Sequence, residues 1–101
     1  MEKRRPHFSL DSFKAVCGDP RRLEMTRSAA ESAAAAGFEY IEISAVIRSM
    51  ETRQFFKSMT SYTNHRRWQD VYHVMWNRAV LYVKFTDDVL TDFVVLSFKE
   101  R

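Results

Sequence analysis

The hydrophobic pattern of this chain changes its period once, after Gln54, and that change limits the folds it can adopt. Before Gln54, apolar residues recur at helical spacing, as Ile43, Val46 and Ile47 do. After it, β-branched and aromatic residues become dense and alternate with polar ones, which is typical of half-buried strands. The sequence therefore predicts an α+β fold, with N-terminal helices packed on a C-terminal antiparallel β-sheet.

Three helices are predicted in the first half, each marked by a residue type that begins or ends helices. Thr26 has the side chain of a helix N-cap and precedes the run RSAAESAAAA, which is rich in the strongest helix former, alanine. Pro20 prevents an earlier helix from continuing past Gly18. The predicted helices extend from Ser9 or Asp11 to Gly18, from Thr26 to Gly37, and from about Glu39 onward.

Four strands are predicted in the second half of the chain. The connections between them are short, and the shortest consists of Asn77 and Arg78. Short connections join strands that run antiparallel, so we expect a meander in which each strand pairs with the next. The predicted strands cover residues 55–62, 68–76, 79–86 and 93–99.

Composition limits the number of domains and the type of partner. With 101 residues, of which 46% are hydrophobic, the chain has material for one core, and we expect a single domain over residues 1–101. The net charge of +3 favours a polyanionic partner. Cys17 is the only cysteine and is predicted to be a buried thiol. We find no signal peptide and no membrane span in the sequence, so we expect a cytoplasmic protein.

Alternation along the strands assigns each side chain to one face of the sheet. A two-residue turn pairs Trp76 with Ala79, and therefore sets His73 opposite Tyr82. If the preceding loop closes in the same way, Tyr62 pairs with Trp68. Lys57 then also falls opposite His73. The predicted polar face contains Lys57, Gln69, His73, Tyr82, Lys84 and Lys99, accompanied by Ser97, Met59, Val71, Val80 and Val95.

The other face is predicted to pack on the helices and form the core. Asp70 is the one charged residue that parity places there, and we expect it to be hydrogen-bonded to a loop amide or to Arg66 or Arg67. Both tryptophans are predicted to pack in the core rather than on bases. The predicted core face contains Trp68, Tyr72, Val74, Trp76, Leu81, Val83, Phe85, Val94, Leu96 and Phe98.

The polar face carries the residue types that a metal-free ribonuclease needs. In such enzymes the RNA 2′-hydroxyl attacks the adjacent phosphate, which requires a base, cations for the developing charge and an acid for the leaving oxygen. Lysine and tyrosine can serve these roles, because clustered cations lower the pKa of a lysine. The three histidines His7, His65 and His73 show no metal-ligand spacing. No metal and no cofactor are therefore expected.

Further side chains are predicted to contact RNA without taking part in the chemistry. Some lie on the polar face and others in the loop that precedes residue 68, where cations can reach phosphates. A solvated face and loop, without any ligand, is the alternative interpretation. Two other function classes also remain: a non-catalytic RNA- or DNA-binding module that uses this face, and an interaction domain whose sheet edge pairs with another chain. The predicted RNA-binding residues are Met59, His65, Arg66, Arg67, His73 and Lys84.

Five stretches of the chain resemble one bacterial family. They are MEKRRPH at the start, TRSA at a helix opening, the long block FFKSMTSYTNHRRWQDVY, the strand LYVKF, and VVLSFKER at the end. Together they resemble the MqsR toxins, the motility and quorum-sensing regulator family of messenger-RNA interferases. The resemblance extends over nearly the whole chain without rearrangement.

The resemblance implies a RelE-like fold and a toxin that arrests growth by cutting single-stranded mRNA at GCU-like sites, without need of a ribosome. It implies neutralisation by a cognate antitoxin of the MqsA type, which binds zinc and has a helix-turn-helix domain. It also matches four catalytic positions. Lys57 and Lys99 are then expected to stabilise phosphorane charge, with one of them a candidate base. Tyr82 is expected to donate a proton to the leaving oxygen or to orient it, and Gln69 to position the phosphate or the attacking hydroxyl.

Overall fold

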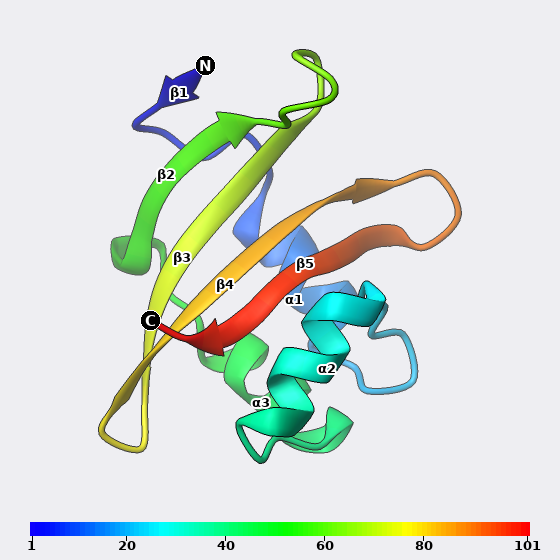
Figure 1. Cartoon of the computed structure of the whole chain (residues 1–101), viewed down its shortest axis with the longest axis vertical. Helices are drawn as coiled ribbons and strands as arrows, with labels where there is room; N and C mark the ends of the chain where they lie inside the picture. The colour runs from blue at the N-terminus through cyan, green and yellow to red at the C-terminus, as the bar shows by residue number, and fades with distance from the viewer.

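The computed structural model describes all residues from 1 to 101 and places three helices before the four long strands of an antiparallel sheet (Figure 1). The α+β prediction is therefore confirmed. None of the helices is both long enough and apolar enough to span a membrane. The elements in chain order are β1 (Glu2–Lys3), α1 (Leu10–Cys17), α2 (Arg27–Ala35), α3 (Tyr40–Ser49), the 3₁₀ turn η1 (Thr52–Gln54), β2 (Phe55–Thr60), β3 (Trp68–Trp76), β4 (Ala79–Asp88) and β5 (Asp92–Glu100).

The helices begin where the sequence predicts, because local side chains satisfy their first backbone N–H groups. The Ser9 hydroxyl accepts from the backbone N–H of Ser12 at 3.1 Å, which caps α1. Thr26 caps α2 in the same way. Gly37 follows the end of α2 with a φ of +90°, a left-handed conformation that glycine adopts without strain.

Replacing Ser9 with alanine is expected to lower the free energy of unfolding by about 1 kcal/mol, because the N–H of Ser12 loses its acceptor. Ser12→Ala is the matched control: its hydroxyl lies on the same helix and makes no hydrogen bond. Urea denaturation of the two variants checks the prediction. Equal midpoints would show that the Ser9 cap contributes nothing.

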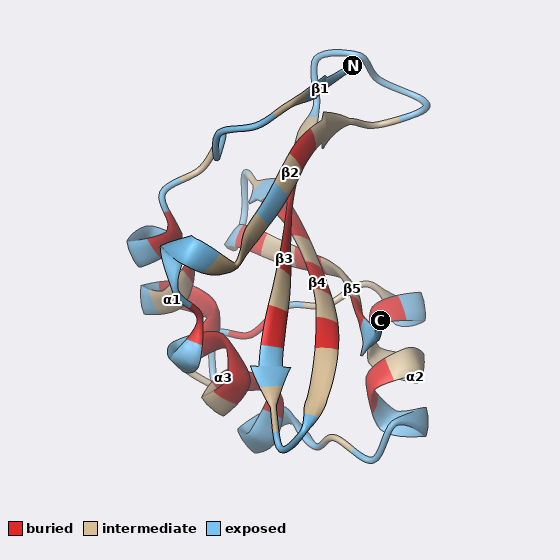
Figure 2. Cartoon of the chain, turned by 90° about the vertical axis from the view of Figure 1, so that its left-hand side faces the viewer, coloured by how far each residue is buried: buried red, intermediate tan, exposed pale blue.

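The sheet has five antiparallel strands in the order β1-β2-β3-β4-β5. The first of them was not predicted: Glu2 and Lys3 pair with Met59 and Ser58 at the outer edge of β2. The helices lie on one side of this sheet, and in Figure 2 the buried positions, in red, occur on the helices and along β2 to β5. The other side of the sheet is free of helices.

The register between the strands confirms one predicted turn and corrects the other. Trp76 pairs with Ala79 and His73 with Tyr82, as the two-residue turn requires. The loop before β3 is longer than predicted, however, so Thr60 rather than Tyr62 pairs with Trp68. The same shift places Lys57 opposite Val71 instead of His73, and a bulge between Phe55 and Lys57 then pairs Phe55 with Tyr72.

A second bulge changes which residues of β5 enter the core. Lys84 pairs with Ser97 but Phe85 pairs with Val95, so Leu96 is the extra residue on β5. Val95 is fully buried in the core, whereas Val94 and Leu96 are only half-buried. The prediction that Val94 and Leu96 face the core, and that Val95 lies on the polar face, was therefore wrong.

The core is one cluster of 19 buried residues between the helices and the sheet. At its centre the rings of Phe13 and Phe85 stack with centroids 3.6 Å apart. Cys17 is fully buried, as predicted, and burial raises the pKa of its thiol to about 11. Trp76 is half-buried and packs against this cluster.

The segment before α1 is held to the sheet by Asp70 and Trp68. The fully buried Asp70 carboxylate accepts from the backbone N–H groups of His7 and Phe8 at 2.9 to 3.1 Å, and from the Ser58 hydroxyl at 2.6 Å. The prediction that Asp70 accepts from a loop amide is thus confirmed, and neither Arg66 nor Arg67 bonds to it. Trp68 is only half-buried, because its ring is covered by the His7 ring and the Lys3 ammonium rather than by the core.

Candidate active site on the outer face of the sheet

The face of the sheet opposite the helices carries three rows of paired residues. Residues that pair across neighbouring strands share a face, so each row can be followed from strand to strand. All six residues of the predicted polar face lie in these rows. The rows are Glu2, Met59 and Gln69; Lys57, Val71, Lys84 and Ser97; and His73, Tyr82 and Lys99.

A hollow of about 640 Å³ opens over the first two rows. It brings together the predicted residues Lys57, Gln69 and Lys84 from three strands, with Met59 beside them and His65 from the β2–β3 loop. The hollow is lined by Met1, Glu2, Lys57, Met59, Thr60, Ser61, Tyr62, His65, Gln69 and Lys84. The remaining predicted residues do not line it: His73, Tyr82 and Lys99 lie in the third row, and Arg66 and Arg67 lie in the loop.

Within the hollow, Lys57 and Glu2 form an ion pair. The Lys57 ammonium donates to the Glu2 carboxylate at 3.0 Å, and the Lys57 side chain is 24% exposed. The hydrogen bond from Lys57, together with its charge, lowers the pKa of Glu2. Glu2 was missed by sequence reasoning because the two-residue strand that carries it is too short to show a periodic pattern. The carboxylate holds the cation at the edge of the hollow.

Lys84 lies in the floor of the same hollow without such a partner. It is half-buried, and its ammonium takes part in no hydrogen bond or ion pair. Burial lowers the pKa of Lys84, and the nearby charges of Lys99 and Lys57 lower it further. These three lysines give the face a positive charge, which attracts negatively charged groups.

The third row is aromatic and basic. The Lys99 ammonium lies 5.4 Å from the centroid of the Tyr82 ring, and the His73 ring lies 6.0 Å from that ring. Phe56 is exposed and stacks on His73 with centroids 4.2 Å apart. Burial and the charge of Arg101 lower the pKa of His73. An aromatic surface beside cations suits the stacking of bases next to bound phosphates.

The three basic residues of the β2–β3 loop have separate surroundings. His65 lines the hollow. Arg67 donates to the backbone carbonyl of Asp87 at 2.8 Å, which joins this loop to the β4–β5 hairpin. The backbone N–H of Arg66 donates to the Asn64 side chain, and the Arg66 side chain is exposed. The loop therefore presents His65 and Arg66 to a ligand more freely than Arg67.

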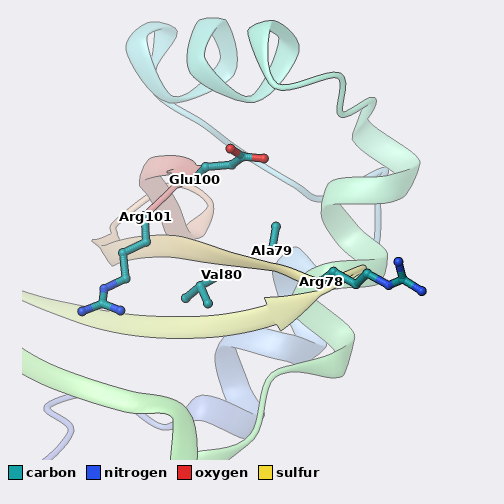
Figure 3. Close-up of a pocket in the computed structure, with 5 residues that line it drawn as sticks. All are labelled: Arg78, Ala79, Val80, Glu100 and Arg101. Carbon is teal, nitrogen blue, oxygen red and sulfur yellow. The ribbon is translucent and has the colours of Figure 1, made fainter.

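A second hollow, of about 650 Å³, lies at the other end of the sheet, where β4 begins and β5 ends. It is lined by Arg78, Ala79, Val80, Glu100 and Arg101 (Figure 3). The guanidinium groups of Arg78 and Arg101 point away from one another in Figure 3, so they do not clamp one anion. None of the predicted site residues lines this hollow.

Comparison with known proteins agrees with the resemblance seen in the sequence. A family model described as "Motility quorum-sensing regulator, toxin of MqsA" matches residues 5–100. The mRNA interferase toxin MqsR of Escherichia coli (strain K12) is 37% identical over 101 residues, and the alignment covers 100% of both chains. Both matches extend from the N-terminal helices through the strands that carry the candidate site.

Proposed function

The chain belongs to the MqsR toxin family, and we propose that it cuts single-stranded mRNA through attack of the RNA 2′-hydroxyl. Membership of the family makes the protein an endoribonuclease toxin, an mRNA interferase. The cleavage sequence, the mechanism and the residues that carry it are our proposal. We expect GCU-like cleavage sites, as the resemblance implies.

The observation that supports the proposal best is the shared face of Lys57, Gln69, Tyr82 and Lys99. Lys57 and Gln69 line the hollow, and Tyr82 pairs with Lys99 in the neighbouring row. Cations and a neutral amide on one rigid sheet are suited to hold a phosphate that gains charge during reaction, because they need no rearrangement when that charge develops.

In the proposed reaction the 2′-oxygen forms a bond to phosphorus and the bond from phosphorus to the 5′-oxygen breaks. Lys57 and Lys99 stabilise the negative charge on the phosphoryl oxygens. Gln69 positions the phosphate or the attacking hydroxyl, since a neutral amide does not move protons efficiently. Tyr82 gives its phenolic proton to the leaving 5′-oxygen. The products are a 2′,3′-cyclic phosphate and a 5′-hydroxyl.

Residues around these four are proposed to bind the RNA strand. Met59 lies in the hollow, where its flexible thioether can pack on a base. His73 with Phe56 offers a stacking surface in the third row. His65 and Arg66 contact phosphates on the loop side, and the bond from Arg67 to Asp87 keeps that loop close to the sheet.

We further infer a protein partner of the antitoxin class. The description of the matching family model names MqsA, and we propose a cognate MqsA-like antitoxin with a zinc site and a helix-turn-helix domain. Because the substrate is mRNA, we propose that the toxin acts in the bacterial cytoplasm.

The purified protein is expected to cut a defined single-stranded RNA with undiminished rate in EDTA, because the proposed chemistry uses side chains and no metal ion. Sequencing of the cleavage ends is expected to show GCU-like sites and 2′,3′-cyclic phosphate termini. RNA that is shifted in a gel but not cut would support the non-catalytic binding module instead. Failure to bind RNA at all would leave the protein-interaction domain.

A further inference from the structure

The proposed reaction needs a group that takes the proton of the 2′-hydroxyl. Of the three lysines on the face, Lys57 and Lys99 already contact other side chains. The Lys57 ammonium donates to the Glu2 carboxylate at 3.0 Å. Lys99 lies over the ring of Tyr82. A base needs a nitrogen that is free to approach the 2′-hydroxyl, and the Lys57 nitrogen is already bonded to Glu2. The base is therefore better sought among side chains without such a partner.

Lys84 occupies the centre of the candidate site. It shares a row with Lys57, and only the fully buried Val71 lies between them. It follows Tyr82 by two residues on β4, so both side chains lie on the same face. It also lines the hollow together with Gln69. Lys84 is thus adjacent both to the residues of the hollow and to the row of Tyr82 and Lys99.

The surroundings of Lys84 favour the neutral amine. Its side chain is half-buried and has no hydrogen-bond or ion-pair partner. Burial lowers its pKa, and the positive charges of Lys99 and Lys57 act in the same direction. A lowered pKa increases the fraction of neutral amine at a given pH, which is the form that a general base requires.

We propose that Lys84 is the general base of RNA cleavage, a role that rests on the ribonuclease function proposed above. Its neutral amine takes the 2′-hydroxyl proton while the 2′-oxygen bonds to phosphorus. The bond to the 5′-oxygen breaks, and that oxygen receives the proton of Tyr82. Lys84 then returns its extra proton through solvent to the Tyr82 phenolate, so one turnover leaves the enzyme unchanged.

Several ionisable groups on neighbouring elements influence the titration of Lys84. Lys57 and Lys99 oppose its protonation, whereas the negative charge of Glu2 is compensated by Lys57. The pKa of His73 is lowered by burial and by the charge of Arg101, and its protonation at low pH would add positive charge. The ionisable groups on this face are the Met1 amino group at the N-terminus, Glu2 on β1, Lys57 on β2, Tyr62 and His65 in the β2–β3 loop, His73 on β3, Tyr82 on β4, and Lys99 with Arg101 at the C-terminal end.

The variant Lys84→Arg separates a base from a simple cation, because arginine keeps the charge but does not release its proton in this pH range. We expect the variant to bind RNA with a 2′-deoxyribose at the cleavage position as tightly as the wild-type protein does. We expect its rate of cutting the all-ribose RNA to fall about a hundredfold or more. In the wild-type protein this rate should rise about tenfold per pH unit below the pKa of Lys84. The variant should lack that rise.

Several results would overturn the role of Lys84. One is a Lys84→Arg protein that cuts at the wild-type rate, and another is a loss of binding equal to the loss of cleavage. If the arginine variant does not fold, Lys84→Gln is measured in its place, and the wild-type pH profile still applies. A wild-type rate for bound RNA that is flat between about pH 6 and 9 excludes a titrating base of this kind. A wild-type protein that does not cut RNA at all would instead overturn the ribonuclease proposal.

Discussion

Lys57→Ala is expected to lower the rate of RNA cleavage at least about a hundredfold, because it removes one preorganised cation from the hollow. The fold is expected to stay intact. The substitution acts twice in the same direction. It removes the charge proposed to stabilise the phosphorane. It also removes the ion-pair partner of the Glu2 carboxylate, which lies 3.0 Å from the Lys57 ammonium in the wild-type protein, so this carboxylate repels the phosphate. The side chain contributes no part of the buried core.

The effect is measured as the rate constant for cutting bound RNA, with circular dichroism to confirm folding. Arg27→Ala is the matched control, since it removes one positive charge from α2, where the Arg27 side chain is 94% exposed. A double variant, Glu2→Ala with Lys57→Ala, should bind RNA more tightly than Lys57→Ala alone if the unpaired carboxylate repels the strand. A folded Lys57→Ala protein that cuts at the wild-type rate would remove Lys57 from the proposed mechanism.

The helices could be predicted from sequence because their boundaries depend on neighbouring residues. Ser9 bonds to a backbone group three residues away, and Thr26 does the same in its own helix. Gly37 supplies a left-handed backbone conformation where α2 ends. Such signals are local and are visible without knowledge of the tertiary structure.

The register of the sheet depended on bulges that no local pattern marks. Leu96 is the extra residue on β5 because Val95 and Phe98 both enter the core, and a strictly alternating strand cannot bury two residues three positions apart. Strict alternation along β5 therefore predicted Val94 and Leu96 on the core face and Val95 on the polar face, which is the reverse of what the structure shows for Val95. Val95 and Phe98 are both buried because the helices pack against this side of the sheet, and that contact is tertiary.

The site residues were placed on the right face even where their predicted partners were wrong. Lys57 pairs with Val71 and not with the predicted His73, but these two partners are two positions apart and so lie on the same face. Glu2 could not be placed from sequence. Its strand pairs with β2 through only two residues, and it is held there by tertiary contacts of the segment that follows.

Asp70→Ala is expected to lower the free energy of unfolding by about 3 kcal/mol or more, because the backbone N–H groups of His7 and Phe8 lose a charged acceptor and the Ser58 hydroxyl loses its partner. For a chain of this size that corresponds to a fall in melting temperature of about 10 to 20 °C. Asp11→Ala is the matched control. Asp11 is exposed in the first turn of α1, where a carboxylate contributes less than about 1 kcal/mol.

The same substitution tests whether Asp70 also holds Glu2 in its place beside Lys57. The hydrogen bonds that the backbone N–H groups of His7 and Phe8 donate to Asp70 fix the segment whose other end brings Glu2 to Lys57. When they are lost, that segment should detach more often, and trypsin should cut after the exposed Arg4 faster in Asp70→Ala than in the wild-type protein at a temperature where both are folded. Equal cutting rates would mean that Trp68, with its contacts to Lys3 and His7, holds the segment without help from Asp70. Glu2 would then keep its place beside Lys57 even in a destabilised protein.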